Sequence, residues 1–141
     1  AFAREGGHAQ IDLVGFSMGA LVSRWMLHNT RAKTRVRRFV SVSGPHHGTL
    51  GAFALPLAGV RQMRRGSAFL AALEAQPEGL QGVEVSCLYT PYDLMIVPAR
   101  SAVLPEAKHV EVVQVGMHRW MITAPKALDA IARCLCRGPG R

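Results

Sequence analysis

The stretch of residues 11–19, Ile-Asp-Leu-Val-Gly-Phe-Ser-Met-Gly, decides the fold of this chain. Its first four residues form a short apolar run bounded by glycines, which predicts a buried strand. Apolar residues then recur at helical spacing from Met18 to about Asn29, which predicts a helix directly after Ser17. Ser17 therefore lies in a sharp turn between a strand and a helix, at the centre of the pattern Gly-x-Ser-x-Gly.

This turn offers what a serine needs to act as a nucleophile. A serine hydroxyl reacts poorly unless it is held in the open beside a base, and a sharp turn exposes it by straining the backbone. Gly15, Phe16 and Gly19 complete the turn, where we expect both glycines to be required because backbone crowds against backbone. The N–H of Met18, at the positive end of the helix, is the expected donor to an oxyanion. A glycine-rich junction with an idle serine is the alternative.

Apolar runs further along the chain predict strands at residues 39–42, 83–89 and 110–115. Helices are predicted from a Ser67 cap to about Ala75, between two of these strands, and after a Thr123 cap, following the last strand. In the last helix the apolar repeat is Leu128, Ile131, Ala132 and Leu135. Apolar strands that alternate with helices are typical of a parallel sheet covered on both faces. The predicted fold class is α/β, a parallel sheet of about four strands with flanking helices.

The charge of the chain is strongly basic. The formal net charge is +8, and it rests almost wholly on arginine because lysine occurs only at Lys33, Lys108 and Lys126. The densest basic run, residues 31–38, has no aromatic residues for base stacking. We therefore predict a solvated connection after the helix there and no nucleic-acid partner; contact with an anionic surface is the alternative.

Cysteine and histidine usage predicts neither a metal nor a cofactor. The three cysteines form no disulfide framework and no zinc spacing, and adjacent His46 and His47 lack a third ligand at a defined distance. The longest apolar stretch, residues 50–60, is shorter than the roughly 20 residues of a membrane span. With no signal peptide apparent, the compartment stays open, and the cytoplasm is slightly favoured. The cysteines are Cys87, Cys134 and Cys136.

The carboxylate that would accompany Ser17 emerges by elimination. Junctions of this type take their acid and then their histidine from later in the chain. Among the aspartates, Asp12 precedes Ser17 and Asp129 lies in the last predicted helix. Asp93 alone follows the carboxyl end of a strand, the sheet edge where catalytic loops gather. The glutamates lie in helical, loop or strand-interior contexts, so we predict Asp93 as the acid.

The base emerges in the same way. Downstream of Asp93 the histidines are His109, which precedes a predicted strand, and His118, which follows it. His118 therefore shares the sheet edge of Ser17 and Asp93. We predict that His118 takes the serine proton while Asp93 holds its tautomer. Taken alone, His118 also fits an ordinary loop histidine.

Four segments in the right order resemble one family. Residues 11–24, 40–49, 92–98 and 116–118 are similar to the nucleophile segment, the Pro-His-His-Gly-Thr stretch, the acid loop and the histidine loop of bacterial triacylglycerol lipases and related esterases. Those enzymes belong to the α/β-hydrolase superfamily. Phe16 stands where many members have histidine, and Ala20 where many have glycine.

The resemblance implies a serine carboxylester hydrolase that works through an acyl-enzyme, an esterase or lipase of lipid metabolism. It also implies strands before the nucleophile, and a loop with the second oxyanion donor, that are not in residues 1–141. We therefore expect a partial domain, the C-terminal half of an α/β-hydrolase fold. A catalytically incompetent remnant is one alternative, and a thioesterase or acyltransferase with the same triad is another.

Residues 48–82 form an insertion where this family often carries a lid. Its apolar start is followed by Arg61, Arg64 and Arg65, which suits acyl chains or a lipid interface through residues 50–65. A packed helical hairpin that covers the sheet is the alternative. The expected partner is a small ester or lipid substrate. The oligomeric state, the acyl chain length and the acceptor stay open.

Overall fold

A computed structural model describes residues 10–53 and 58–137 of the chain. Its strands form a four-stranded sheet in the order β1-β2-β3-β4, and each neighbouring pair is parallel. This confirms the predicted α/β class and the parallel sheet. The helix end expected within residues 1–10 lies almost wholly outside the described residues. The strands are β1 (Ile11–Phe16), β2 (Val36–Val42), β3 (Glu84–Tyr89) and β4 (His109–Val112).

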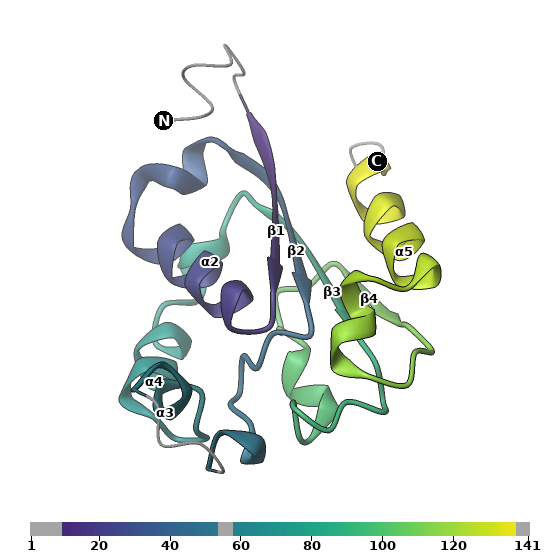
Figure 1. Ribbon diagram of the computed structural model, residues 1–141. Helices are drawn as coiled ribbons and strands as arrows, with labels where there is room; N and C mark the ends of the chain where they lie inside the picture. The colour runs from purple at the N-terminus through teal and green to yellow at the C-terminus, as the bar shows by residue number, and fades with distance from the viewer. Residues whose placement is uncertain (1–9, 54–57, 138–141) are drawn as a thin grey trace.

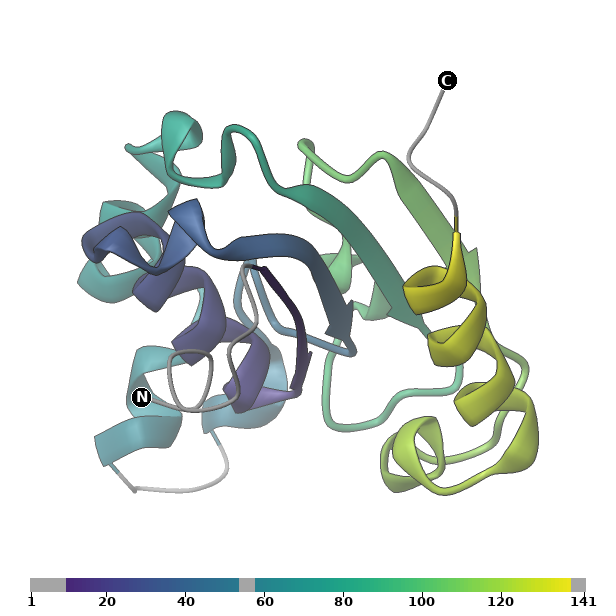
Figure 2. The same ribbon diagram turned by 90° about the horizontal axis from the view of Figure 1, so that it is seen from above.

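Helices cover both faces of this sheet, as Figures 1 and 2 show. Helix α2 packs on one face, with α4 and the turn η3 against it, and α5 packs on the other. None of the described helices is long and apolar enough to span a membrane. The helices are α2 (Met18–Asn29), α3 (Ala58–Gln62), α4 (Ala68–Glu74) and α5 (Pro125–Cys136); the short turns are η1 (Arg31–Thr34), η2 (Leu50–Phe53), η3 (Pro77–Leu80), η4 (Ala99–Ala102) and η5 (His118–Ile122).

The sheet separates two apolar cores. Side chains alternate along β2, so Phe39 enters the core under α2 while Val40 and Val42 enter the core under α5. Near the first core, Ser67 caps α4 as predicted, since its Oγ accepts a hydrogen bond from Leu70 N at 3.2 Å. The sheet is thus buried on both sides, which explains why its central strands are apolar throughout.

The basic run at residues 31–38 differs from its prediction. Strand β2 begins inside it, at Val36, and Arg38 is buried with 4% of its surface exposed. Its guanidinium lies 3.4 Å from Asp12 Oδ2 and donates to the backbone oxygens of Leu135 and Arg137 at the end of α5. Residues 36–38 therefore belong to a strand and not to a connection, and only Arg37 among them stays exposed. A carboxylate and helix-end carbonyls satisfy the buried charge of Arg38.

The last helix is also shifted relative to its prediction. The residue before α5 is Ala124, and Thr123 makes no cap because its Oγ1 donates to Arg119 O within the preceding turn. The buried positions of α5 are Ala127, Ala130 and Cys134, whereas Leu128 is 48% exposed. The predicted apolar face is thus only partly right: Ile131 and Leu135 pack against the core, whereas Leu128 and Ala132 are exposed and small residues take the most buried positions.

Strand β4 is shorter than predicted. It spans His109–Val112, not residues 110–115, so His109 lies within the strand. Val113 and Val115 stay buried beyond its end, and Val113 N still donates to Tyr89 O at 2.8 Å. The apolar run in the sequence indicates which residues are buried. The buried segment continues for a few residues after the strand has ended, so the predicted strand was too long at this end.

Candidate active site

Ser17 lies between β1 and α2 in an unusual backbone conformation. Its φ is 53° and its ψ is −125°, a region that side-chain-bearing residues rarely adopt. The turn is held by a hydrogen bond from Ser17 N to Val42 O, at 2.9 Å, and by one from Ala20 N to Ser17 O, at 3.0 Å. Met18 opens α2, so its N–H has no acceptor within the helix. The serine is presented at the positive end of a helix.

The two glycines of the motif have different surroundings. A Cβ on Gly15 would lie 2.7 Å from Ala20 Cα, so this position admits no side chain without a backbone shift. A Cβ on Gly19 would have no heavy atom within 4 Å. The expectation that both are sterically required is therefore wrong for Gly19, which lies in the exposed first turn of α2. The crowding continues from Ala20 to Gly44, where an added Cβ would lie 2.6 Å from Ala20 Cβ.

Buried Asp93 pairs with the half-buried His118. His118 Nδ1 lies 2.7 Å from Asp93 Oδ2, and Asp93 is 4% exposed. The other carboxylate oxygen accepts hydrogen bonds of 2.9 Å from the N–H groups of Met95 and Ile96. Burial alone would raise the pKa of Asp93, but these hydrogen bonds and the one to His118 outweigh it, so the pKa lies below its ordinary value. Asp93 is therefore an ionised acceptor beside the imidazole.

The sheet edge brings Ser17 and this pair to the same side of the molecule. Strands β1, β3 and β4 end before Ser17, Asp93 and His118 respectively, and parallel strands share one carboxyl edge. The ring of Phe16, next to the serine, packs on the His118 ring with centroids 4.7 Å apart. Within the described residues, Ser17 Oγ makes no hydrogen bond to His118.

Two apolar hollows flank Leu94 and Met95 at this edge. One, of about 230 Å³, is lined by Ser17, Met63 and Ile96 among others; the second, of about 360 Å³, is lined by Met117 and His118. Leu94 is 86% exposed and Met95 is 56% exposed, and both line each hollow. A bond placed between Ser17 and His118 would thus have apolar space on either side.

Thr49 is a residue of this region that the sequence reasoning passed over. Its hydroxyl donates to Met95 O at 2.7 Å and accepts from Val97 N at 2.8 Å. It therefore links the start of the segment between β2 and β3 to the loop that carries Asp93. Its position at the end of the Pro-His-His-Gly-Thr stretch could have identified Thr49 as a residue of the site from the sequence.

His46 and His47 turn toward different partners. His46 Nε2 lies 2.7 Å from Ser41 Oγ in the interior, and burial holds the pKa of His46 well below its ordinary value. The ring nitrogens of His47 lie 3.0 Å from Glu74 Oε1 and from Val103 O. The pair does not converge on a common point.

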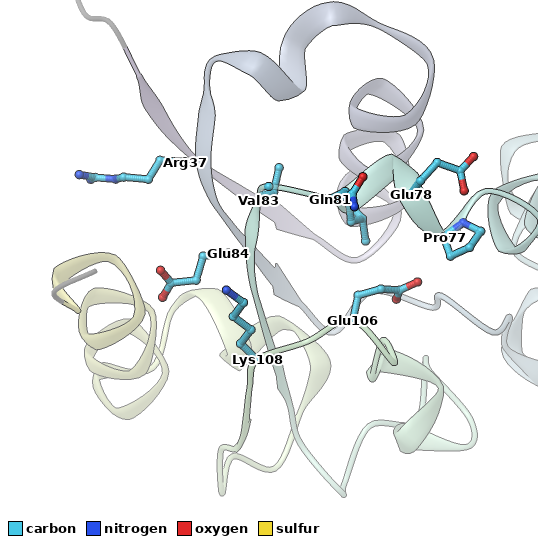
Figure 3. Close-up of a pocket in the computed structure, with 10 residues that line it drawn as sticks. Arg37, Pro77, Glu78, Gln81, Val83, Glu84, Glu106 and Lys108 are labelled. Atoms are coloured by element: carbon cyan, nitrogen blue, oxygen red, sulfur yellow. The ribbon is translucent and has the colours of Figure 1, made fainter. Parts of the chain in front are cut away.

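A larger hollow, of about 720 Å³, lies at the opposite edge of the sheet. Figure 3 shows the charged side chains around it, Arg37, Glu84 and Lys108 among them. They come from the starts of β2 and β3 and from the residue before β4, and parallel strands start at the edge far from Ser17. This hollow is separate from the candidate active site.

Comparisons with known proteins agree with this architecture. The model of a family described as palmitoyl protein thioesterase matches residues 3–92, which is more than half of the chain. Among curated proteins, none matches. Solved structures resemble it at 16–20% identity, a likeness that shows the fold alone.

Three of these structures illustrate the likeness. A Bacillus licheniformis lipase in its propeptide form has a TM-score of 0.77 at 17% identity and covers 99% of this chain. Aspergillus fumigatus lipase B has 0.72 at 20% identity and covers 94%. The product of the gene lin2722 from Listeria innocua has 0.68 at 16% identity and covers 99%. The chain spans 38% of each lipase and 62% of the Listeria protein.

Proposed function

This chain belongs to the palmitoyl protein thioesterase family, within the α/β-hydrolase superfamily, and we propose that it is a serine hydrolase of ester or thioester bonds. The nucleophile is Ser17, the base is His118 and the orienting acid is Asp93. The observation that carries this proposal is the 2.7 Å contact between His118 and Asp93 at the sheet edge that also presents Ser17. A relay of this order and placement is the arrangement that activates a serine in such folds.

The reaction follows from the two nitrogens of His118. Nδ1 donates its hydrogen to Asp93 Oδ2, so Nε2 is left as the acceptor. Nε2 takes the proton of Ser17 Oγ as this oxygen attacks the carbonyl carbon, and the N–H of Met18 stabilises the negative oxygen that forms. His118 then protonates the departing alcohol or thiol. Water, deprotonated by His118, releases the acid from the acyl-enzyme.

The two apolar hollows indicate how a substrate would bind. The one lined by Ser17 would receive the acyl chain, and the one lined by His118 would receive the leaving group. Leu50 and Phe53, in the 48–82 insertion, are 52% and 57% exposed, and the Arg64 guanidinium lies 5.0 Å from the centre of the Phe53 ring. An apolar surface with an arginine beside it supports the lid and the lipid contact through residues 50–65. Of that segment, residues 54–57 lie outside the described part.

The family match favours thioesters among the possible substrates. The acyl-enzyme is the same for an oxyester, a thioester or a transfer to another acceptor, so the triad cannot choose between them. Turnover of matched oxyester and thioester substrates of equal chain length measures the preference directly. Adding an alcohol or amine acceptor, and following its acylation against acid release, measures transfer.

Labelling by a fluorophosphonate probe tests the nucleophile without requiring turnover. The chain should be labelled and Ser17→Ala should not. Asp93→Asn should be labelled roughly 10⁴-fold more slowly, because its histidine would take the wrong tautomer. Ser67→Asn is the matched control, because asparagine caps a helix as well as serine does. A folded chain that takes no label, with circular dichroism unchanged, would instead support the inactive remnant.

A further inference from the structure

The polar side chains of strand β4 face helix α5, and its apolar side chains face outward. His109 and Glu111 face α5, as their contacts with Arg137 and Arg133 show, whereas Val110 and Val112 are 42% and 45% exposed on the other side. A sheet face under a helix normally carries apolar residues and the solvated face polar ones. The inward polar residues of β4 are therefore placed for something other than apolar packing.

A buried thiol from α5 completes a cluster with these residues. Cys134 is 1% exposed, and its Sγ, a ring nitrogen of His109 and a carboxylate oxygen of Glu111 all lie within 4.8 Å of one another. Imidazole nitrogen, carboxylate oxygen and thiolate sulfur are the ligands that zinc uses in proteins. We propose that His109, Glu111 and Cys134 bind one divalent ion of the zinc class, with water completing a tetrahedral site.

The hydrogen bonding around His109 supports this proposal. Its Nε2 lies 3.2 Å from Glu111 Oε2 and also 3.2 Å from an Nη2 of Arg137. A ring nitrogen either donates to the carboxylate or accepts from the guanidinium, so one of these contacts is always unsatisfied. An ion between Nε2 and Oε2 takes a lone pair from each atom and removes the conflict. Arg137 then moves aside.

The remaining arginine is compatible with a bound ion. Arg133 donates to Oε1 of Glu111, which leaves Oε2 for the metal, and ligating carboxylates commonly have such a partner. Binding converts the Cys134 thiol to a thiolate and releases one proton per ion. The dipositive ion is then balanced by one thiolate and one carboxylate.

The site would fasten β4 to α5 at one point. Residues 113–124, which include His118, connect these two elements, and Figure 1 shows α5 beside β4. A bound ion therefore holds both ends of the segment that carries the proposed base. Its place in the fold is that of a structural clamp.

Cobalt(II) is the probe that tests ligation, because it reports a bound thiolate through a charge-transfer band in the near ultraviolet. The chain should bind one equivalent of Co²⁺ with this band and lose it to Zn²⁺. Cys134→Ser should abolish the band, whereas Cys136→Ser, an exposed thiol two residues on, should keep it. Arg137→Ala should bind at least as tightly as the parent, because the competitor for His109 is gone.

A second measurement covers the case in which Cys134→Ser does not fold. Zn²⁺ at about 100 times its Kd should shift the unfolding equilibrium about 100-fold toward the folded chain. Glu111→Gln keeps the shape of the side chain but should lose the Zn²⁺-dependent shift of the unfolding equilibrium. Cys136→Ser should retain that shift. Absence of the band from the parent, or loss of it in Cys136→Ser alone, would overturn the site. Ser17→Ala should bind the ion with the same affinity as the parent chain. The metal-binding proposal and the proposed hydrolase function can therefore be tested independently.

Discussion

At the scale of single residues, the turn around Ser17 shows how much one position can demand. Gly15 faces the backbone of Ala20, whereas Gly19 faces open space in the first turn of α2. The two glycines look equivalent in the motif, but only the first is enclosed. A pair of alanine substitutions therefore separates the steric requirement of the turn from the motif itself.

Gly15→Ala should destabilise the chain by about 1–3 kcal/mol, the usual range for forced overpacking. Gly19→Ala should be neutral or should stabilise it by up to about 1 kcal/mol, because alanine is the better helix residue. Urea unfolding followed by circular dichroism measures both. Equal losses for the two variants would contradict the difference in their surroundings.

At the scale of elements, α5 shows which side of a helix the sheet accepts. Its buried side consists of Ala127, Ala130 and Cys134, while Leu128 points outward. Small residues at these three positions let the helix lie close to β2 and β3, while Ile131 and Leu135 of the predicted face pack against the same core and stay partly buried. Which residues of α5 face the sheet thus depends on how closely the helix can approach the sheet, and not on hydrophobicity alone.

Ala130→Leu should cost about 1–3 kcal/mol, because the three added carbon atoms have no room at a position that is 1% exposed. Leu128→Ala should stay within about 0.5 kcal/mol of the parent, as exposed substitutions usually do. Thermal unfolding of both variants checks the phase. A loss of 2 kcal/mol or more in Leu128→Ala would place that side chain in the core.

At the scale of the whole molecule, apolar side chains are exposed near β1 on both faces of the sheet. Met18, Val22 and Trp25 of α2 are 47%, 58% and 46% exposed, and Val14 of β1 is 43% exposed. Within residues 10–53 and 58–137, β1 pairs with β2 alone, so its other edge offers free backbone groups. An edge of this kind beside apolar side chains is a template for pairing with another chain.

We therefore expect the 141-residue chain on its own to self-associate through this surface. Val22→Lys should lower the association, because a charge there opposes the contact. Leu128→Lys is the matched control: it adds the same charge at a position that is 48% exposed on the far side of the sheet. Light scattering on size-exclusion chromatography measures both. An equal effect of the two variants would mean that net charge alone governs association.

Local patterns in the sequence determined the order of strands and helices, the turn at Ser17 and the shared edge of Ser17, Asp93 and His118. Parallel strands put every carboxyl end on one side, so chain order alone was enough to predict that Ser17, Asp93 and His118 follow strands at the same edge. The roles of these residues stay predictions until labelling tests them.

Only the tertiary structure decided what depends on contacts between distant segments. The burial of Arg38 requires the end of α5, the open space at Gly19 requires the path of α2, and the cluster of His109, Glu111 and Cys134 requires a strand and a helix to meet. Periodicity records which side of an element is apolar, but it holds no information about what lies opposite. That is why the strands and the site edge were predictable, and the neighbours of single side chains were not.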